Sequence, residues 1–440
     1  MTKEINKEIL ADFRKNLNQD ATNNVLKNSV AQVGIYKASE NPEAKTLLNP
    51  SFNITVDTGK VSNQKHSGRC WLFAALNTLR TEFALKNNLK DFELSQNYLS
   101  FYDRLEKSNH FYQAVIATAD LPIDDRKVNN IFSSPNGDGG FWRYAANLIE
   151  KYGVVPSYVM PETAASDNTT EFNDVLGKLL RKNGIELRHL VQEGLSEKKI
   201  NQRVEEMLSE VYRLCVYSFG LPPKKFELSL QNDNGKLIEE NSITPKEFLK
   251  RYFTMDLNDY AIIENSPQKS KRYHQVYTIE GTGNVVGGAV DKFLNLPIDR
   301  LKELSVEQLK GNDTIWFGND VSEESDRKKG YLLGDLYQYD QLFGIDSQVE
   351  KGLRLDYKQA AVSHAMTITG VNLVNGEPNR WKVENSWGQA NGENGYFMMD
   401  QKWFEDYVYE VIINKKYLTN QELNEYDQEP VVLPAWDSLS

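Results

Sequence analysis

The chain contains two cysteines, and only one of them stands where a reactive thiol would be useful. Cys70 comes immediately before an apolar pattern, starting near Trp71, that predicts a helix. The positive end of a helix dipole lowers the pKa of a thiol, and a thiolate is the nucleophile needed to cleave a peptide bond. Cys215 lies within an apolar run with helical neighbours, so we interpret it as a core residue. Cys70 is therefore the candidate nucleophile.

Gln64 is the candidate hydrogen-bond donor to the negative charge that develops on the carbonyl oxygen of the substrate. It lies six positions before Cys70, on the same segment. We expect its side-chain amide to lie beside the sulfur and to share an oxyanion with the backbone N–H of Cys70. Hydrogen-bond donors of this kind typically stabilise a transition state by about 2.7–4 kcal/mol.

A thiol nucleophile needs a base, and the base must be held in one orientation. His364 opens an alternating strand pattern, and the end of a strand is a rigid place for an imidazole ring. Asn385, further along, can accept a hydrogen bond from the ring N–H and fix its tautomer, while Trp387 is placed to shield that bond from water. The other histidines stand in a loop or in charged segments and are expected at the surface: His66, His110, His189 and His274.

The segments that carry these residues differ in predicted secondary structure. Apolar residues at helical spacing predict helices within five stretches: 5–30, 71–83, 96–118, 141–151 and the charged stretch 160–260. From about residue 260 the pattern changes to strands, including 260–263, 277–279, 314–317, 365–374, 380–384, 395–399 and 407–413. Helices first and strands later predict an α+β fold, with the nucleophile and the base supplied by opposite parts of the chain.

Three separated segments resemble the papain superfamily of cysteine peptidases. They are Gln64 to Trp71, Ser363-His364-Ala365 and Glu384-Asn385-Ser386-Trp387-Gly388, in the family's order. Two features depart from the secreted papains. Ser67 replaces a structural half-cystine, and 294 residues separate Cys70 from His364. Because the papain spacing is about 130–150 residues, well over a hundred residues are inserted between the two halves of the site.

With this insertion, the run Asn63-Gln-Lys-His-Ser-Gly-Arg-Cys-Trp resembles the bleomycin hydrolase family, which includes the bacterial aminopeptidase C enzymes. Other segments along the chain are also similar to that family: Glu93-Leu-Ser-Gln-Asn-Tyr-Leu, Asp138-Gly-Gly, Glu150-Lys-Tyr-Gly-Val-Val-Pro and Val431-Val-Leu-Pro-Ala-Trp-Asp. The resemblance implies a thiol protease that hydrolyses peptides through a thioester on Cys70.

The resemblance also implies a papain-like fold of two subdomains with a large helical insertion. Gly139 and Gly140 would line the cleft and bind the substrate backbone, where a side chain would block a peptide. Trp71 is assigned to substrate binding with them, and the insertion would build a ring-shaped homohexamer. The expected division of the chain is an N-terminal helix and lead-in (1–60), a helical subdomain with the nucleophile (61–160), the insertion (161–260), a β-rich subdomain with His364 and Asn385 (261–415) and an arm directed to the cleft (416–440).

The C-terminal arm bears on which peptides are cut. In aminopeptidases of this family the arm lies in the cleft, and its carboxylate holds the free amino group of the substrate. Here Trp436 and Asp437 are followed by only three residues, ending at Ser440. The arm is about three or four residues short, so at ~3.3–3.6 Å per extended residue the carboxylate would stop roughly 10–14 Å early. A charge beyond a Debye length cannot anchor an ammonium group. We therefore expect an endopeptidase or oligopeptidase, with an aminopeptidase as the alternative.

Composition argues against several other classes. A formal net charge of −11 gives no general attraction to DNA or anionic lipid, so nucleic-acid binding is not expected. The sequence shows no apolar stretch of the length needed for a signal peptide or a membrane span. Two cysteines in a chain of 440 residues suggest free thiols in a reducing compartment. We therefore expect a cytoplasmic protein.

Cofactor and metal sites are not expected either. The run Gly281-Thr-Gly-Asn-Val-Val-Gly-Gly does not have the spacing of a dinucleotide-binding loop and predicts a turn between strands. Two distant cysteines and five scattered histidines lack the paired spacing of metal ligands. A papain-like binding protein with an idle thiol is a further alternative, although all four candidate site residues are retained.

Overall fold

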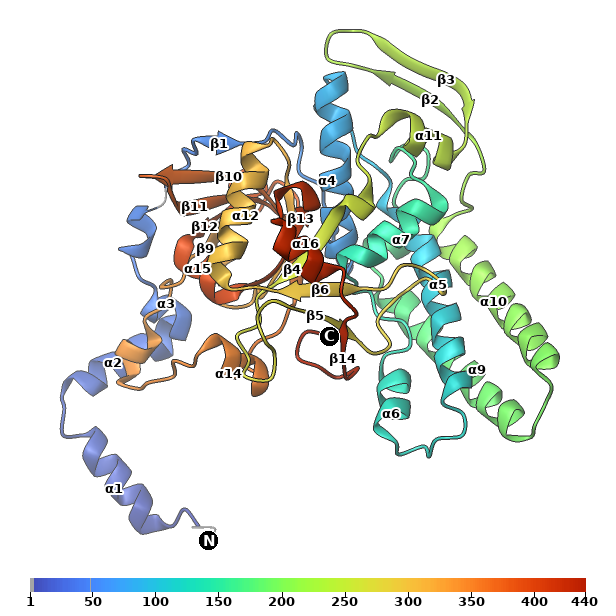
Figure 1. Ribbon diagram of the computed structural model, residues 1–440. Helices are drawn as coiled ribbons and strands as arrows, with labels where there is room; N and C mark the ends of the chain where they lie inside the picture. The colour runs from blue at the N-terminus through green and yellow to red at the C-terminus, as the bar shows by residue number, and fades with distance from the viewer. Residues whose placement is uncertain (1–3, 48) are drawn as a thin grey trace.

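The computed structural model describes residues 4–47 and 49–440 (Figure 1). Helices dominate the first half of the chain and strands the second, so the predicted α+β fold is confirmed. In Figure 1 the helices α5, α9 and α10 stand to one side, while most of the strands gather in a twisted sheet on the other. Helix α4 lies between these two parts.

Helices form where apolar side chains recur every three or four residues. Helix α4 is buried almost all round and is correspondingly apolar over most of its length. It ends at Asn88, whose left-handed backbone (φ +55°) closes the last turn. The α-helices are α1 (Lys7–Leu17), α2 (Thr22–Val33), α3 (Ile35–Ser39), α4 (Cys70–Asn87), α5 (Gln96–Ala117), α6 (Arg126–Ser133), α7 (Trp142–Tyr152), α8 (Ala164–Asp167), α9 (Thr170–Gln192), α10 (Glu197–Phe219), α11 (Pro245–Tyr252), α12 (Ile298–Lys310), α13 (Tyr339–Phe343), α14 (Lys351–Asp356), α15 (Gln401–Tyr407) and α16 (Asn420–Tyr426).

The described residues form one twelve-stranded, mixed sheet with the order β14-β5-β6-β4-β13-β7-β10-β11-β12-β9-β8, and β1 pairs with β10. The strands predicted from the sequence after residue 260 are all present. Their bounds are β1 (Ile54–Thr55), β4 (Tyr260–Glu264), β5 (Gln275–Ile279), β6 (Lys292–Asn295), β7 (Ile315–Asn319), β8 (Ser325–Asp326), β9 (Tyr331–Leu332), β10 (His364–Val374), β11 (Glu377–Glu384), β12 (Tyr396–Asp400), β13 (Val408–Asn414) and β14 (Val431–Leu433).

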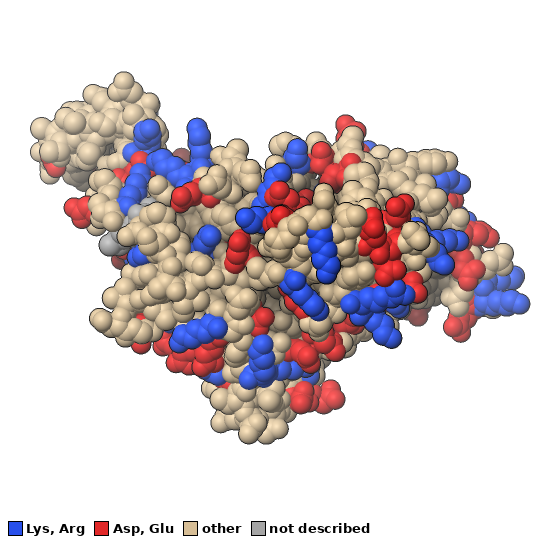
Figure 2. All heavy atoms as spheres, turned by 90° about the horizontal axis from the view of Figure 1, so that it is seen from above, with Lys and Arg blue, Asp and Glu red and all other residues tan. Residues whose placement is uncertain are grey.

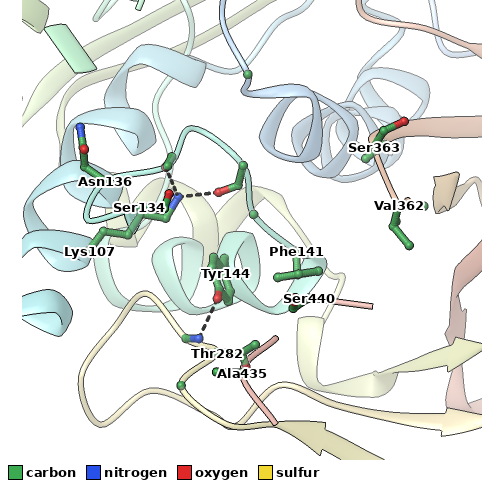
Figure 3. A pocket seen from close by; sticks show the side chains of 18 of the residues that line it. Lys107, Ser134, Asn136, Phe141, Tyr144, Thr282, Val362, Ser363, Ala435 and Ser440 are labelled. Atoms are coloured by element: carbon green, nitrogen blue, oxygen red, sulfur yellow. Dashed lines mark hydrogen bonds between the residues drawn. The ribbon is translucent and has the colours of Figure 1, made fainter. Parts of the chain in front are cut away.

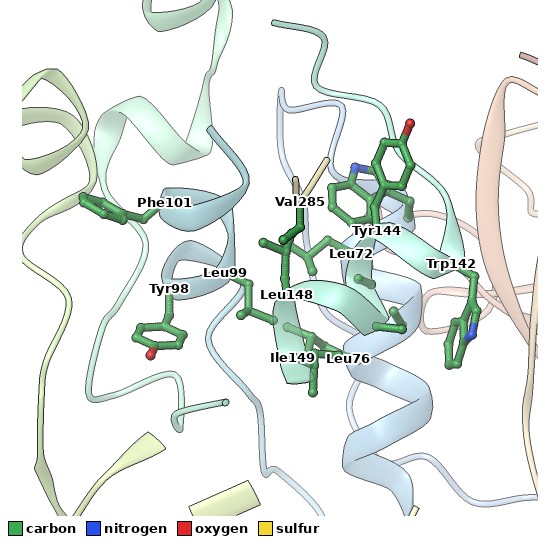
Figure 4. Packing of buried hydrophobic residues seen from close by; sticks show 14 of the residues in the cluster. Leu72, Leu76, Tyr98, Leu99, Phe101, Trp142, Tyr144, Leu148, Ile149 and Val285 are labelled. Atoms are coloured by element: carbon green, nitrogen blue, oxygen red, sulfur yellow. The ribbon is translucent and has the colours of Figure 1, made fainter. Parts of the chain in front are cut away.

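Two large hydrophobic cores hold these elements together. The first packs α4, α5 and α7 against one another and against one face of the sheet. The second lies under the other face, around Phe317, Trp381 and Trp403. The indole N–H of Trp316 donates to the backbone oxygen of Trp71 at 3.0 Å, which ties β7 to α4. Figure 4 shows part of the first core: Leu72, Leu76, Leu99, Leu148 and Ile149.

The N-terminal segment differs from the single helical stretch expected over residues 5–30. It forms two helices, α1 and α2, separated by a turn at residues 18–21. Neither helix has a buried residue, so the amphipathic pattern of α1 faces solvent in the single chain. Among the helices of the described residues, none has the length and apolarity required to cross a bilayer.

The stretch 160–260 contains the amphipathic helices that were expected, α9 and α10. It also contains a hairpin that was not predicted, formed by β2 (Phe226–Gln231) and β3 (Leu237–Ile243). The hairpin follows from Asn234-Gly235, a turn signal between two alternating segments, and Gly235 adopts a positive φ of +79°. The high charge of the surrounding helices obscured this local signal.

Charged side chains of both signs are interspersed over the face seen in Figure 2. Basic groups do not gather there into one continuous patch.

Candidate active site

A cleft of about 990 Å³ lies between the helical part and the sheet. Cys70 reaches it from the start of α4, Gln64 from the segment before that helix, and Gly139 and Gly140 from the loop before α7. His364, the first residue of β10, lines the same cleft. Figure 3 shows Lys107 and Tyr144 on the helical side, opposite Val362 and Ser363. The structure thus gathers the sequence-predicted residues around one cavity.

Cys70 is the first residue of α4 and is half-buried in the cleft wall. Burial raises the pKa of the Cys70 thiol, and hydrogen bonds from the backbone N–H groups of Ala365, Trp71 and Cys70 act in the opposite direction. The helix terminus alone therefore does not give the low thiol pKa that was expected, because desolvation outweighs it. A nearby imidazolium is the further stabilisation that a thiolate at this position needs.

His364 is held by two neighbours. Its Nε2 lies 2.9 Å from Oδ1 of Asn385, and its ring packs against Trp387 with the centroids 4.8 Å apart. Burial lowers the pKa of His364 to about 4, a shift that the Asn385 hydrogen bond opposes and the charge of Arg327 increases. The ring is therefore neutral at pH 7 and can accept a proton. Asn385 and Trp387 are in the positions that the sequence predicted.

The thiol and the imidazole are not joined by a hydrogen bond in this structure. Within residues 4–47 and 49–440, no hydrogen bond joins Cys70 to His364, although both side chains line the cleft. Catalytic hydrogen bonds are often long or poorly aligned without substrate. Since Asn385 occupies Nε2, the nitrogen left for Cys70 is Nδ1.

Gln64 is fixed from both sides of the cleft. Its Nε2 donates to the backbone oxygen of Ser67 at 2.6 Å, and its Oε1 accepts from the hydroxyl of Ser386. Its backbone N–H also donates to the oxygen of Ser386 at 2.8 Å. An amide nitrogen carries two hydrogens, so the bond to Ser67 leaves the second one available to an oxyanion. Ser386 lies beside Asn385, and the donor and the base are therefore positioned by one segment.

The glycine loop lies on the helical side of the cleft. Gly139 has open space where a Cβ would stand, whereas a Cβ on Gly140 would meet the ring of Trp71 at 2.7 Å. Trp71 is 1% exposed and its indole N–H donates to the oxygen of Asp138 at 2.8 Å. Trp71 thus lies behind the cleft wall and supports Gly140, and it is not among the residues that line the cleft.

Two residues that fix this loop were not recognised as functional from the sequence. The Lys107 ammonium donates to the backbone oxygens of Gly137 and Gly139, at 3.1 and 2.6 Å, and also pairs with Asp103. Asp138 accepts from the backbone N–H of Gly68 at 2.9 Å and pairs with Arg104. The loop is therefore tied both to α5 and to the segment that carries Cys70. A lysine within a mixed-charge helix gives no sequence signal for such a role.

The C-terminal arm runs along the sheet and ends at the cleft. Strand β14 pairs in parallel with β5, and Trp436 packs beneath Arg126, 4.0 Å from its guanidinium carbon. Asp437 pairs with Lys271 at 3.0 Å. The chain then turns back, since the N–H of Ser440 donates to the oxygen of Asp437 at 3.1 Å. Leu439 is 2% exposed, and Ser440 lies in the cleft wall (Figure 3).

The remaining histidines divide into two groups. His66, His189 and His274 are exposed, as expected, and His274 pairs with Glu425 at 3.0 Å. His110 was expected at the surface, but it is half-buried and lines the cleft. Burial lowers the pKa of His110. Its side of α5 faces the cleft, which the charged residues around it in the sequence did not reveal.

Comparison with known proteins gives matches over the whole chain. The model of the Peptidase C1-like family matches residues 4–440. Aminopeptidase C of Lactobacillus helveticus is 45% identical over 442 residues, covering 100% of this chain and 98% of that protein. Aminopeptidase E of the same species is 44% identical and covers 100% of both. The crystal structure of PepW from Lactobacillus rhamnosis HN001 has a TM-score of 0.98 at 45% identity, covering 100% of this chain and 99% of that one.

These matches confirm the resemblance drawn from the motifs around Cys70, His364 and Asn385. They include the residues between the two halves of the site, which secreted papains do not have. They also include the arm that ends in the cleft wall. The chain therefore belongs to the Peptidase C1-like family and is a papain-like cysteine peptidase.

Proposed function

We propose that this cysteine peptidase removes residues from the amino terminus of peptides. The observation that carries the proposal is the end-to-end match, at 45% and 44% identity, to proteins named aminopeptidase C and aminopeptidase E. The arm supports it, because Leu439 is buried beside the cleft and Ser440 is part of its wall. A cleft narrowed by the protein's own chain favours the end of a peptide over its middle.

The endopeptidase expected from the length of the arm is less well supported. That expectation assumed that the arm stays extended and leaves the cleft open. Ser440 instead folds back onto Asp437, through both its N–H and its hydroxyl group, and still borders the cleft. The relatives favour the aminopeptidase alternative, and the arm does not contradict it.

In the proposed reaction, His364 takes the proton of Cys70 through Nδ1, and the thiolate attacks the carbonyl of the first peptide bond. The oxyanion is stabilised by the amide of Gln64 and the backbone N–H of Cys70. The imidazolium then protonates the leaving amine, which departs as the shortened peptide. Water, deprotonated by His364, hydrolyses the thioester and releases the amino acid. Asn385 holds the ring in one orientation throughout.

The test compares substrates that differ only in their amino terminus. Aminoacyl 4-nitroanilides with a free amine should be hydrolysed, whereas their N-acetyl counterparts and an internally quenched peptide blocked at both ends should be cleaved far more slowly. Rapid cleavage of the blocked peptide, without release from the free aminoacyl anilides, would overturn the proposal in favour of an endopeptidase. Iodoacetamide should abolish the activity, and persistence of hydrolysis after full alkylation of Cys70 would remove its assigned role.

The division of the chain suggests how the protein assembles. The helices α9 and α10 stand on the outside in Figure 1, and the cleft residues come from other segments. We propose that the insertion at 161–260 mediates a homohexamer with its clefts facing an enclosed channel, and that the protein acts in the cytoplasm as a free-thiol enzyme. Light scattering should give about six times 50.4 kDa. A stable monomer at micromolar concentration would exclude the assembly.

A further inference from the structure

A row of four residues crosses four neighbouring strands of the sheet, starting beside the nucleophile. Ala365 of β10, whose backbone N–H lowers the pKa of the Cys70 thiol, is opposite Gly318 of β7. Gly318 is opposite Glu410 of β13, and Glu410 is opposite Glu264 of β4. Directly opposed residues point to the same face of a sheet. The row therefore leads along one face from the thiol to two glutamates.

The spacing of the strands fixes how far the glutamates are from the reaction. Neighbouring strands lie about 4.8 Å apart, so the Cα of Glu410 is about 10 Å from that of Ala365. Gly318 lies between them and has no side chain that could separate the Glu410 carboxylate from the cleft. A Cβ on Gly318 would meet the Glu410 carboxylate at 3.1 Å. Because that Cβ is absent, the Glu410 carboxylate borders the cleft.

The two glutamates are buried without a partner. Glu410 is 3% exposed and Glu264 is 7% exposed. Among the described residues neither side chain forms a hydrogen bond or an ion pair, and Oε2 of Glu264 is a buried acceptor without a donor. The positive charge of Lys271 lowers the pKa of Glu264, but this lysine is already paired with Asp437 of the arm. A carboxylate buried in this way is costly in its ionised form unless a cation binds it, and without a cation it takes up a proton.

Around the glutamates the walls are apolar and the space is small. Asp291 is the third acid of the group, and the remaining walls are Phe141, Ile262, Ile279, Phe293 and Leu439. The cavity enclosed by these side chains has about 10 Å³, room for roughly one water molecule. Leu439 thus closes the deeper part, so a lysine or arginine side chain does not fit while the arm is in place. Glu410 is the member of the group that also borders the open cleft.

We propose that Glu410 binds the free α-ammonium group of the peptide substrate, with Glu264 and Asp291 adding negative charge behind it. This inference rests on the proposed aminopeptidase function. It deepens that function by naming the carboxylate that binds the positively charged amino group of the substrate. The α-ammonium is two bonds from the carbonyl carbon that Cys70 attacks, so it must lie close to the start of the row. The role does not depend on how far the arm reaches.

Binding of an ammonium group beside these acids is coupled to the loss of a proton from them. Burial and the neighbouring acids raise the pKa values of Glu410 and Glu264 well above that of an ordinary glutamate, and burial raises the pKa of Asp291 to about 6. An ammonium group stabilises the ionised form, so its binding releases a proton at mildly acidic pH. The KM for free-amino substrates should therefore fall as the pH rises, until the α-amine itself deprotonates near 7.7–8.0. Glu264 and Asp291 act on Glu410 directly, Lys271 and Asp437 act on Glu264, and Arg143 acts on Asp291.

The experiment uses the full-length variant Glu410→Gln, which keeps the shape and removes the charge. For alanyl and leucyl 4-nitroanilides, kcat/KM should fall by about 10- to 100-fold, mainly through KM, as expected for a hydrogen bond to a charged group. The fall of KM with rising pH should disappear. The residual rate on an N-acetylated anilide and the rate of Cys70 alkylation by iodoacetamide should stay within twofold of the wild type. Glu410→Asp, which retains the charge, should restore part of the loss.

Several outcomes would overturn the inference. The first is a Glu410→Gln variant with wild-type kcat/KM and pH profile on free-amino substrates. The second is an equal loss on free and acetylated anilides, which would show a structural effect. A loss confined to lysyl and arginyl anilides would assign Glu410 to a side chain instead. The matched control is Glu324→Gln, a half-buried acid with a raised pKa, of about 7, which does not line the cleft and should leave the pH profile of KM unchanged.

Failure of the proposed aminopeptidase function can be distinguished from failure of the inference about Glu410. A wild-type protein that prefers doubly blocked peptides over free-amino anilides would refute the aminopeptidase before any variant is compared. A wild-type aminopeptidase with an indifferent Glu410 would refute only the present inference. Thermal unfolding of each variant shows whether it is folded. If Glu410→Gln does not fold, Gly318→Ala, which places a methyl group beside the Glu410 carboxylate, should raise KM for the same free-amino substrates.

Discussion

Asn385 determines which nitrogen of His364 can meet the thiol. Its Oδ1 lies 2.9 Å from Nε2, so Nε2 carries the hydrogen and Nδ1 is the basic atom. Burial lowers the pKa of His364 to about 4, which keeps the ring neutral at pH 7 before substrate binds. The same burial disfavours the imidazolium, so the thiolate–imidazolium pair is stabilised only when the two charges are adjacent.

Cys70→Ala and His364→Ala should each reduce kcat to near the uncatalysed rate, because each removes a group that bonds to substrate or moves its proton. Asn385→Ala should be milder, since the ring keeps its contact with Trp387. Steady-state hydrolysis of an aminoacyl anilide measures all three variants. Wild-type kcat/KM for Cys70→Ala would contradict the assignment of the nucleophile.

Gln64→Ala should lower kcat by about 10²–10³, with little change in KM, because the lost donor acts on charge that develops in the transition state. The matched control is His66→Ala, an exposed residue of the same loop. It should keep the wild-type kcat. If both variants lost activity equally, the loop as a whole rather than the amide of Gln64 would be responsible.

Residues with short-range motifs could be predicted from the sequence, whereas residues defined by distant contacts could not. Gln64, Cys70, His364 and Asn385 stand in local patterns whose chemistry is specific. Glu410 stands in an otherwise apolar run, and a single acid there gives no sign that it opposes Glu264 across a strand pair. The support of Gly140 by Trp71 also needs the folded structure.

At the scale of elements, the loop before α7 depends on two adjacent glycines for different reasons. A Cβ on Gly140 would meet the Trp71 ring at 2.7 Å, whereas a Cβ on Gly139 has open space. Gly140→Ala should therefore destabilise the protein by about 1–3 kcal/mol, as overpacking typically does. Gly139→Ala should keep the wild-type stability, and its methyl group should act only on KM.

Chemical unfolding compares the two glycine variants directly, and anilide kinetics separate stability from binding. Equal stability of Gly140→Ala and the wild type would mean that the Trp71 ring moves aside. A Gly139→Ala variant that is strongly destabilised would show that the loop is tighter than the contacts of Gly139 indicate.

Periodicity predicted most of the elements that carry the site, including α4 and the strands β7, β10 and β13. The break between α1 and α2 was missed because helical spacing continues across it in the sequence. The hairpin β2–β3 was missed because its alternating strands lie among charged helices. In both cases the deciding signal is a turn of a few residues, which is hidden when the apolar pattern is assessed over a longer stretch of sequence.

At the scale of the whole molecule, the acids beside the cleft lower the free energy of unfolding when they are ionised. Acids whose pKa is raised on folding lose stability as the pH rises from their unfolded pKa through their folded pKa. For Asp291 this interval runs from about 4 to about 6, and Glu264 and Glu410 act in the same direction. Well below pH 4 all three are protonated in both states, and this loss of stability vanishes.

Glu410→Gln should therefore be more stable than the wild type at pH 8 and equally stable at pH 4. The free energy of unfolding, from denaturant titrations at the two pH values, measures the difference. Burial of His364 acts on both proteins alike and cancels in the comparison. A variant that is less stable than the wild type at pH 8 would show that the Glu410 charge has a partner in the folded protein.

The pairing of the sheet with the segment around Cys70 has a consequence for biosynthesis. The nucleophile leaves the ribosome first, and its base follows 294 residues later. At about 5–20 residues per second, the nascent chain spends roughly 15–60 s with a thiol that has no imidazole and no Ser386 to fix Gln64. Until His364 has been synthesised, the growing chain lacks the base that the thiol needs, so the distance between the two halves of the site delays the first possible cleavage.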